Sequence, residues 1–391
     1  MFEIMDRETQ EAVIKVIGVG GCGGNAVSHM IEKNVGGVEF ICANTDMQAL
    51  KKSQAKTVLQ IGIDITKGLG AGARPEIGRE AALEDRDRIA EVIDGADMLF
   101  ITAGMGGGTG TGAAPIIAEV AKELGILTVA VVTKPFAFEG KRTRVANEGL
   151  EELSKHVDSL IIIPNEKLME VLGEDVPFLE AFRAANDVLH NAVSGIAEII
   201  NCPGLVNVDF ADVRTVMSEM GMAMMGSATA TGPDRARIAA EQAVASPLLE
   251  DVNLANARGV LVNITANHSF KMKEYYDVMN TIKEFTAEDA TVIVGNVFDD
   301  SIEDGLRVTM VATGLNGAAG RRQLKPELRV MTQLRDGTTN QAMFTSNNNG
   351  GMEDEAPAVF TSNGRRAQVE AMKLSGVEEY DIPAFLRKQA D

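Results

Sequence analysis

The chain has 391 residues, of which 45% are hydrophobic and 24% are charged, so it is long enough for two domains with separate cores. Its net charge of −19 disfavours nucleic-acid binding by general electrostatic attraction and direct adsorption to an anionic membrane. Its three cysteines lack metal-ligand spacing, the amino terminus lacks a secretory signal, and no apolar run approaches a membrane span. These features predict a cytoplasmic protein that reaches a membrane only through a partner.

Strand-like and helical stretches alternate through the first half of the chain. Apolar, often β-branched residues predict strands at 13–17, 38–43, 57–61, 98–102, 126–133 and 159–163. Helical patterns at 26–33, at 76–93 and from Ala113 onward lie between them. This alternation predicts an α/β fold with a parallel, doubly wound sheet, in which ligands bind at the carboxyl ends of the strands.

A glycine-rich loop follows the first strand and reads Gly18-Val19-Gly20-Gly21-Cys22-Gly23-Gly24-Asn25. It matches the dinucleotide-binding fingerprint G-x-G-x-x-G at Gly18, Gly20 and Gly23. A Rossmann-type enzyme that binds NAD or FAD is therefore one candidate for the function.

A second glycine-rich loop, at 104–112, joins the strand at 98–102 to a helical pattern, and Thr109 and Thr111 add hydroxyl donors to it. A strand, a glycine loop and a helix start together offer backbone N–H groups and the positive end of a helix dipole to a phosphate. A P-loop NTPase is excluded because the chain contains no G-x-x-x-x-G-K-[ST] motif. Both glycine loops follow strands of the same sheet, so one pocket can receive both, whereas a Rossmann enzyme has no place for the second.

The residues from Gly106 to Gly112 read GGGTGTG, which is the signature of the tubulin and FtsZ superfamily. The chain resembles the bacterial cell-division members of that superfamily from about Val13 to its last residues. The resemblance implies a cytoplasmic, Mg²⁺-dependent GTPase that binds GTP and GDP. It also implies self-assembly into head-to-tail filaments, which form a ring at the mid-cell division site.

The resemblance further implies a set of GTP-binding residues on the glycine loops, at neighbouring strand ends and on a later helix. They are Gly20, Gly21, Cys22, Gly23, Gly24, Asn25, Asn44, Ala71, Gly72, Ala73, Gly104, Gly106, Gly107, Gly108, Thr109, Gly110, Thr111, Gly112, Pro135, Glu139, Arg142, Phe182 and Asn186. Mg²⁺ is expected to be held mainly by the phosphates of GTP, with no protein ligand assigned. The stretch after Glu139, the ribose-binding position, is one residue shorter than the family pattern. Arg142 is the preferred phosphate contact, and Arg144 is its competitor.

Pro177 and Pro203 bracket an uninterrupted helical pattern, in which apolar residues recur at spacings of three and four. At about 1.5 Å per residue this helix is roughly 35–40 Å long, which suits a connector between two domains. Phe182 and Asn186 lie four residues apart on one face. The resemblance places them against the guanine base, although the residues alone favour a core role for Phe182.

Three polar residues, Asn207, Asp209 and Asp212, follow the connecting helix. Asp209 suits a helix N-cap, with Asp212 at the third helical position, and capping alone could account for both acids. The resemblance implies instead that Asn207, Asp209 and Asp212 enter the nucleotide pocket of the next subunit and complete hydrolysis in trans. A nucleotide-binding filament without catalysis differs from this only in whether the two acids act.

The remainder of the chain predicts a smaller α/β domain with a mixed sheet, followed by a polar segment and an apolar tail. Strands are expected at 222–228, 259–265, 291–297 and 306–312, and helices at 234–245 and 271–285. The full predicted division is a flexible terminus (1–12), a GTP-binding domain (13–177), a connecting helix (178–202), a GTPase-activating domain (203–317), a disordered linker (318–379) and a tail peptide (380–391). The resemblance implies that Asp381, Ile382, Pro383, Phe385 and Leu386 of the tail bind membrane-anchoring and regulatory division proteins.

Overall fold

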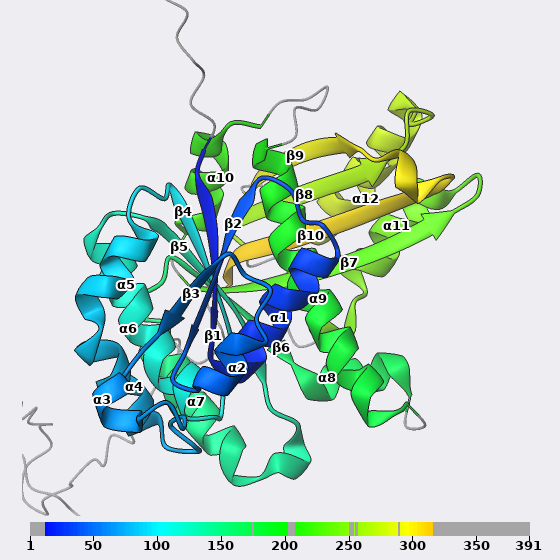
Figure 1. Cartoon of the computed structure of the whole chain (residues 1–391). Coiled ribbons are helices and arrows are strands. Elements are labelled where there is room, and N and C mark those ends of the chain that lie inside the picture. The colour runs from blue at the N-terminus through cyan, green and yellow to red at the C-terminus, as the bar shows by residue number, and fades with distance from the viewer. Residues whose placement is uncertain are drawn as a thin grey trace, which may run out of the picture. The chain divides into compact units, whose positions relative to one another are not determined.

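A single sheet of ten strands organises the part of the chain described in the computed structural model, residues 12–173, 176–201, 208–219, 221–249, 254, 257–287 and 290–315 (Figure 1). The strands are β1 (Ile14–Val19), β2 (Val38–Asn44), β3 (Thr57–Gln60), β4 (Met98–Gly104), β5 (Leu127–Lys134), β6 (Ser159–Pro164), β7 (Gly221–Thr231), β8 (Gly259–Ala266), β9 (Thr291–Phe298) and β10 (Gly305–Leu315). Their order across the sheet is β3-β2-β1-β4-β5-β6-β7-β10-β8-β9. The predicted linker, the tail peptide and Asn207 lie outside the described residues, and the domain boundaries given above stay predictions.

The first six strands pair in parallel throughout, which confirms the predicted doubly wound sheet. The helices are α1 (Gly20–Glu32), α2 (Met47–Lys51), α3 (Ile63–Thr66), α4 (Pro75–Glu84), α5 (Arg86–Ile93), α6 (Thr109–Glu123), α7 (Lys141–Leu153), α8 (Asn165–Leu172), α9 (Phe178–Asn201), α10 (Phe210–Met217), α11 (Arg235–Val244) and α12 (Met272–Phe285). Short 3₁₀ turns occur at η1 (Ala137–Glu139), η2 (Pro247–Leu249) and η4 (Asp300–Ile302).

The last four strands form the predicted mixed sheet, because β10 runs antiparallel to both β7 and β8 while β8 and β9 are parallel. They continue the first sheet without a break. β7 pairs in parallel with β6 between Ser159 and Ile161. This junction was not predicted from the sequence, because each strand's own pattern says nothing about which strand lies beside it.

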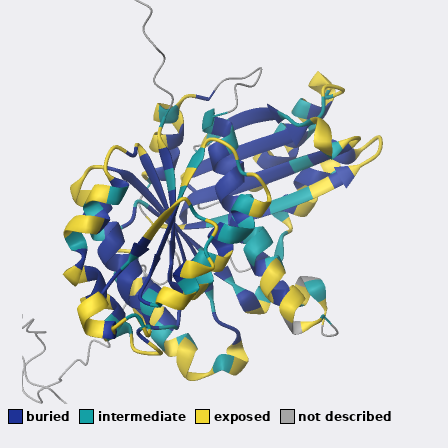
Figure 2. Cartoon of the chain, viewed as in Figure 1, coloured by how far each residue is buried: buried dark blue, intermediate teal, exposed yellow. Residues whose placement is uncertain are grey.

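Helices cover both faces of the parallel strands, so successive strand residues alternate between two apolar cores (Figure 2). On one face Val16 and Phe100 pack with α1 and α9, and on the other Ile17 and Ile101 pack with α5, α6 and α7. All four side chains are fully buried. Burial on both faces explains why these strands read as continuous apolar runs in the sequence.

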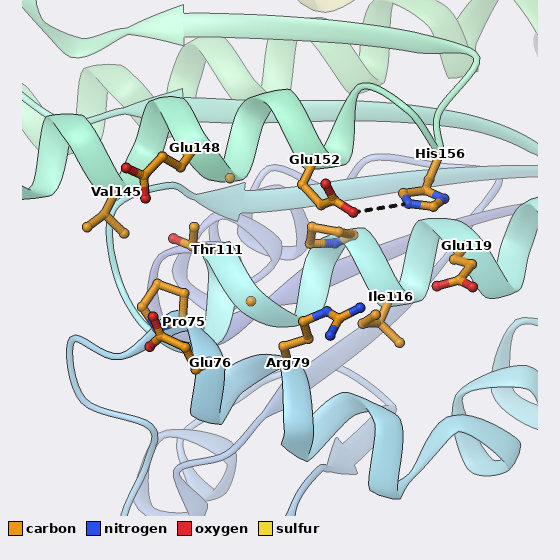
Figure 3. Close-up of a pocket in the computed structure, with 13 residues that line it drawn as sticks. Pro75, Glu76, Arg79, Thr111, Ile116, Glu119, Val145, Glu148, Glu152 and His156 are labelled. Carbon is orange, nitrogen blue, oxygen red and sulfur yellow. Dashed lines mark ion pairs between the residues drawn. The ribbon is translucent and has the colours of Figure 1, made fainter.

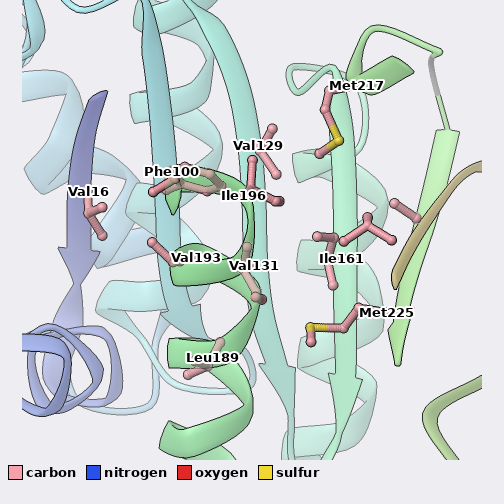
Figure 4. Packing of buried hydrophobic residues seen from close by; sticks show 14 of the residues in the cluster. Val16, Phe100, Val129, Val131, Ile161, Leu189, Val193, Ile196, Met217 and Met225 are labelled. Carbon is pink, nitrogen blue, oxygen red and sulfur yellow. The ribbon is translucent and has the colours of Figure 1, made fainter. Parts of the chain in front are cut away.

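Helix α9 is the predicted connecting helix, and it lies against the face shared with α1. Its apolar stripe of Leu189, Val193 and Ile196 packs onto Phe100, Val129 and Val131 of the sheet (Figure 4). Its carboxyl end is fixed near the amino end of β2, where the Asn201 side-chain amide donates to the Gly37 carbonyl at 2.8 Å. The helix therefore runs from the carboxyl ends of the parallel strands to their amino ends.

Three predicted helix boundaries were wrong. α1 begins at Gly20 and α6 at Thr109, so part of each glycine loop forms the first turn of a helix. The predicted helix at 76–93 is two helices that break at Asp85. At the break the Asp85 carboxylate accepts hydrogen bonds from the Gly62 N–H, 23 residues earlier in the chain, and from Arg88, both at 2.7 Å.

Candidate functional site

A cavity of about 270 Å³ lies at the carboxyl edge of the parallel strands, where the prediction placed the ligand. The ends of β1, β4 and β5, the first turns of α6 and α8, and one face of α9 all contribute to it. Its lining includes these predicted residues: Gly21, Cys22, Gly72, Gly104, Gly107, Gly108, Thr109, Gly110, Pro135, Glu139, Arg142, Phe182 and Asn186. The fold therefore brings both glycine loops and the predicted base-contacting pair to one cavity.

Three hydrogen bonds from backbone N–H groups fix the conformation of the loop before α6. The Gly108 N–H donates to the Gly72 carbonyl at 2.9 Å, and the Met105 N–H donates to the Thr133 carbonyl at 2.9 Å. The Gly106 N–H donates to the Thr111 hydroxyl oxygen at 2.8 Å, so Thr111 closes the loop from inside. These bonds leave Gly107 at the cavity, where a side chain would meet no other atom within 4 Å.

Helices α1 and α6 begin next to each other at this cavity. Gly20 has a φ of 74°, which favours glycine, and a Cβ atom there would lie 3.0 Å from the Gly110 nitrogen and would push the two first turns apart. Neither helix carries an acidic residue in its first turn or a side-chain N-cap. Because the first N–H groups of a helix have no partner within it, the two starts together form a positively polarised, anion-accepting wall.

The opposite wall is aromatic and polar. Phe182 is 37% exposed and packs edge-on against Phe136, with ring centroids 5.6 Å apart. Asn186 lies one turn later on α9 and lines the same cavity. A planar base could stack on Phe182 while the Asn186 amide offers both a donor and an acceptor.

Glu139 and Arg142 form the rim. One Glu139 oxygen accepts from the Phe136 N–H at 3.0 Å, and the other accepts from the Arg142 guanidinium at 2.8 Å. Arg144 is turned away, with an exposed side chain that pairs with Glu148 at 3.0 Å. Of the two arginines left open by the sequence, the fold places Arg142 at the cavity.

Sequence reasoning missed Thr133 and Asn165, both of which line the cavity. Asn165 is 5% exposed, and its side-chain oxygen has no hydrogen-bond partner within the described structure. Both residues stand where a strand of the parallel sheet ends, which is the signal that could have found them. The Thr133 hydroxyl lies 3.7 Å from the Cys22 sulfur, and burial raises the pKa of the Cys22 thiol, so that side chain stays neutral.

Several predicted residues lie outside this cavity. Gly24, Asn25 and Asn44 line an adjoining pocket of about 280 Å³, which shares Gly21 with the first. Gly23 is buried against β4, since a Cβ there would lie 2.3 Å from the Thr102 carbonyl oxygen. Gly112 packs against α4 instead of facing the cavity.

The glycine-rich loop before α4 reaches the cavity only at Gly72. The side chain of Ala71 is buried, and its N–H donates to the Thr45 hydroxyl at 3.1 Å. That hydroxyl lies 2.7 Å from the Thr109 hydroxyl, so this loop is tied to the start of α6. Ala73 is exposed at the surface.

The two predicted catalytic acids lie near the amino ends of the parallel strands, whereas the cavity lies at the carboxyl ends. Asp209 caps α10, with its carboxylate accepting from the Asp212 N–H at 2.8 Å, and both residues are exposed. Arg214 of the same helix donates to the Gly125 carbonyl at 3.4 Å, just before β5 begins. The span from Phe182 to the end of α9 alone is about 29 Å at 1.5 Å per residue, so these acids cannot reach the cavity of their own chain.

Two further observations concern the described residues only. They hold no group of three or more His, Cys, Asp or Glu side chains arranged to bind a metal ion. None of their helices combines the length and the apolarity that crossing a bilayer requires.

Comparison with known proteins gives a consistent result. The profile of the Tubulin/FtsZ family, GTPase domain, matches residues 13–173, and that of the FtsZ family, C-terminal domain, matches residues 221–316. The chain is 59% identical to the cell division protein FtsZ of Pseudomonas aeruginosa, with all of both chains covered. It is 57% identical to that of Coxiella burnetii, with 99% of each chain covered.

Solved structures agree. An empty FtsZ dimer from M. jannaschii superposes with a TM-score of 0.76 and 43% identity, covering 79% of this chain and 90% of that one. CetZ2 from Haloferax volcanii, at 20% identity and a TM-score of 0.64, shares the fold. On both its GTPase-domain and its C-terminal-domain matches, the chain belongs to the Tubulin/FtsZ family, in the FtsZ branch.

Proposed function

We propose that this chain is a GTP-hydrolysing subunit of the filament that divides the cell, with GTP or GDP bound in the cavity between the two glycine-rich helix starts and α9. The single observation that carries the proposal is the convergence of α1 and α6 opposite Phe182 and Asn186. Its full-length relatives, called cell division protein FtsZ, support the same assignment.

The lining residues fit the three parts of a nucleotide. The phosphates face Gly21, Gly107 and Gly110, where backbone N–H groups and the positive ends of the helix dipoles stabilise negative charge. Arg142 adds a cation from the rim. Bound Mg²⁺ would supply positive charge to the phosphates, which would be its main ligands, and the Thr109 hydroxyl at the cavity would be a protein oxygen able to join them.

The other parts of the nucleotide follow the remaining wall. The ribose lies near Glu139, and the base stacks on Phe182 with its edge toward Asn186. The unpaired Asn165 oxygen is a further acceptor for a ligand donor.

Hydrolysis requires a water molecule that is positioned and partly deprotonated, and the lining of the cavity offers Glu139 as its only carboxylate among the described residues. Glu139 is already engaged by Arg142 and by the Phe136 N–H. Asp209 and Asp212 are exposed and form no ion pair within the described structure, but they lie near the amino ends of the parallel strands, away from the cavity. We therefore assign them, with Asn207, to the cavity of the next subunit in a head-to-tail filament.

The NAD- or FAD-binding alternative is not favoured. Gly18 and Gly23 of the dinucleotide fingerprint pack against each other, since a Cβ on Gly18 would lie 2.4 Å from the Gly23 carbonyl oxygen. They close the turn between β1 and α1, which any strand-to-helix phosphate site of this kind needs. The second glycine loop lines the same cavity as the first, and a Rossmann enzyme has no counterpart to it.

The remaining assignments extend beyond the described residues. The chain works in the cytoplasm at the mid-cell division site, and its tail binds membrane-anchoring and regulatory division proteins through Asp381, Ile382, Pro383, Phe385 and Leu386. What supports this is an apolar peptide after a polar stretch, which suits capture in a partner's groove.

The test is GTP turnover per subunit measured over a range of protein concentrations, with pelleting of polymer in parallel. Turnover per subunit should be near zero at low concentration and rise where polymer first pellets, because each site is completed by a neighbour. A turnover per subunit that is independent of concentration would rule out the shared site.

Replacing Arg142 with glutamine should weaken GDP binding by about tenfold, because a charge-assisted hydrogen bond to phosphate is lost. It also leaves Glu139 unpaired beside the phosphates. Equilibrium titration with a fluorescent GDP analogue measures the effect. Arg144→Gln removes the same charge two residues away and should leave the affinity unchanged, so equal losses in both variants would contradict the assignment.

A further inference from the structure

A second cavity, of about 390 Å³, lies on the opposite side of α6 from the nucleotide cavity, between α4 and α7. It shares no lining residue with the nucleotide cavity. In Figure 3, Glu76 and Arg79 of α4 face Glu148 and Glu152 of α7, with Thr111 and Ile116 of α6 between them.

Two glycines bring three helices into contact beside this cavity. A Cβ on Gly112 would lie 2.0 Å from the Pro75 carbonyl oxygen, and one on Gly149 would lie 2.3 Å from the Thr111 methyl carbon. These contacts bring α4 and α7 against α6 from two sides. The space that remains between the three helices, about 390 Å³, is within the range of small-molecule sites.

The floor of the cavity is apolar and its rim is acidic. Pro115 and Ile116 are buried in the floor, and Val145 is half-buried beside them. Glu148 of the rim already has a basic partner in Arg144, and Glu152 has two, Lys155 and the cavity residue His156. Two carboxylates of the cavity, Glu76 and Glu119, have no ion pair among the described residues. One guanidinium of the cavity, Arg79, also has none. The uncompensated charge is therefore negative.

Thr111 connects this cavity to the phosphate loop. Its methyl group lies against Gly149 of α7, while its hydroxyl oxygen accepts the Gly106 N–H at 2.8 Å. Gly106 has a φ of 97°, which glycine adopts readily, and the hydrogen bond to Thr111 fixes the loop there. A ligand that holds α4 and α7 against Thr111 would keep the loop in its binding conformation.

We propose that the cavity between α4, α6 and α7 is a binding site for a small amphipathic cation, with an apolar ring on Ile116 and an amine at Glu119, and that its occupancy strengthens nucleotide binding. The coupling rests on the proposed nucleotide site, whereas the cation site does not.

The probe is 1-naphthylmethylamine, with 1-naphthalenemethanol and 1-naphthoate as the neutral and anionic analogues, titrated into the full-length protein by calorimetry. The amine should bind at one site per chain. Glu119→Gln should weaken it about tenfold through loss of a hydrogen bond to a charged group. Glu123→Gln is the matched control, because it removes the same charge one turn later on α6, where Glu123 pairs with Arg86 outside the cavity.

Val145→Trp fills the cavity from its half-buried wall and should abolish binding, with retention of the fold checked by melting. Equal binding of the alcohol or the naphthoate would overturn the cation assignment. Amine binding that survives both Val145→Trp and Glu119→Gln would overturn the site. Saturating amine should tighten GDP binding about threefold, and GDP should tighten the amine by the same factor. An unchanged or weakened GDP affinity, with amine binding intact, would overturn the coupling alone.

Discussion

Replacing Asp212 with asparagine is expected to lower GTP turnover by at least about 100-fold, which is the scale on which a positioned general base contributes. GTP affinity should stay unchanged, because Asp212 lies near the amino ends of the parallel strands and the cavity lies at their carboxyl ends. The fold should also survive, since the Asp209 cap accepts from the Asp212 backbone N–H and not from its side chain. Steady-state phosphate release and equilibrium GTP binding measure the two effects.

Glu219→Gln is the matched control, because it removes one half-buried carboxylate just beyond the same helix, where Glu219 pairs with Arg258 at 3.6 Å. Its turnover should equal that of the parent protein. Full turnover in Asp212→Asn, or an equal loss in Glu219→Gln, would remove Asp212 from the catalytic role.

Mixing two inactive variants distinguishes a shared site from a site within one chain. Asp212→Asn keeps its cavity, and Gly107→Val keeps its acids but places a side chain where the phosphates bind. An equal mixture should regain about a quarter of the parent turnover, the share of head-to-tail interfaces that combine a sound cavity with a sound acid. No recovery in pelleted mixed polymer would contradict hydrolysis in trans.

Gly112→Ala should lower the free energy of unfolding by about 3 kcal/mol, at the upper end of the cost of overpacking. The new methyl group would lie 2.0 Å from the Pro75 carbonyl oxygen and 2.6 Å from the Arg79 nitrogen. Both are backbone atoms, so α4 as a whole must move away from α6. Chemical denaturation followed by circular dichroism measures the loss.

Gly107→Ala is the companion variant within the same signature. Its Cβ would meet no atom within 4 Å, so the free energy of unfolding should not change. GDP affinity should fall, because the methyl group projects into the cavity wall that we propose binds a phosphate. If Gly112→Ala were the weaker GDP binder and Gly107→Ala the less stable protein, the division of the signature into packing and binding glycines would be wrong.

Much of the fold could be predicted from the sequence because its signals are local. Burial on both faces makes β4 and β5 continuous apolar runs, and the spacing of apolar residues marks α9 between two prolines. The site's position followed from topology, since the glycine loops after Ile17 and Thr102 end neighbouring parallel strands.

What could not be predicted depends on contacts between distant residues. The break at Asp85 requires the Gly62 N–H, which lies 23 residues earlier. The signature glycines look equivalent in sequence, yet Gly107 faces the cavity and Gly112 faces α4. The choice between Arg142 and Arg144 required the folded structure, in which Arg142 pairs with Glu139 at the cavity. Arg144 pairs instead with Glu148, which does not line that cavity.

The span of α9 has a consequence for how activity depends on polymer length. In the filament proposed above, α9 holds the cavity and the acids at opposite ends of each subunit, so one terminal cavity has no acids and one terminal pair of acids has no cavity. A filament of n subunits then contains n − 1 complete sites. The inactive terminal site is therefore a large share of the sites in a short oligomer and a small share in a long one. The terminal cavity without acids keeps its GTP until the next subunit is added.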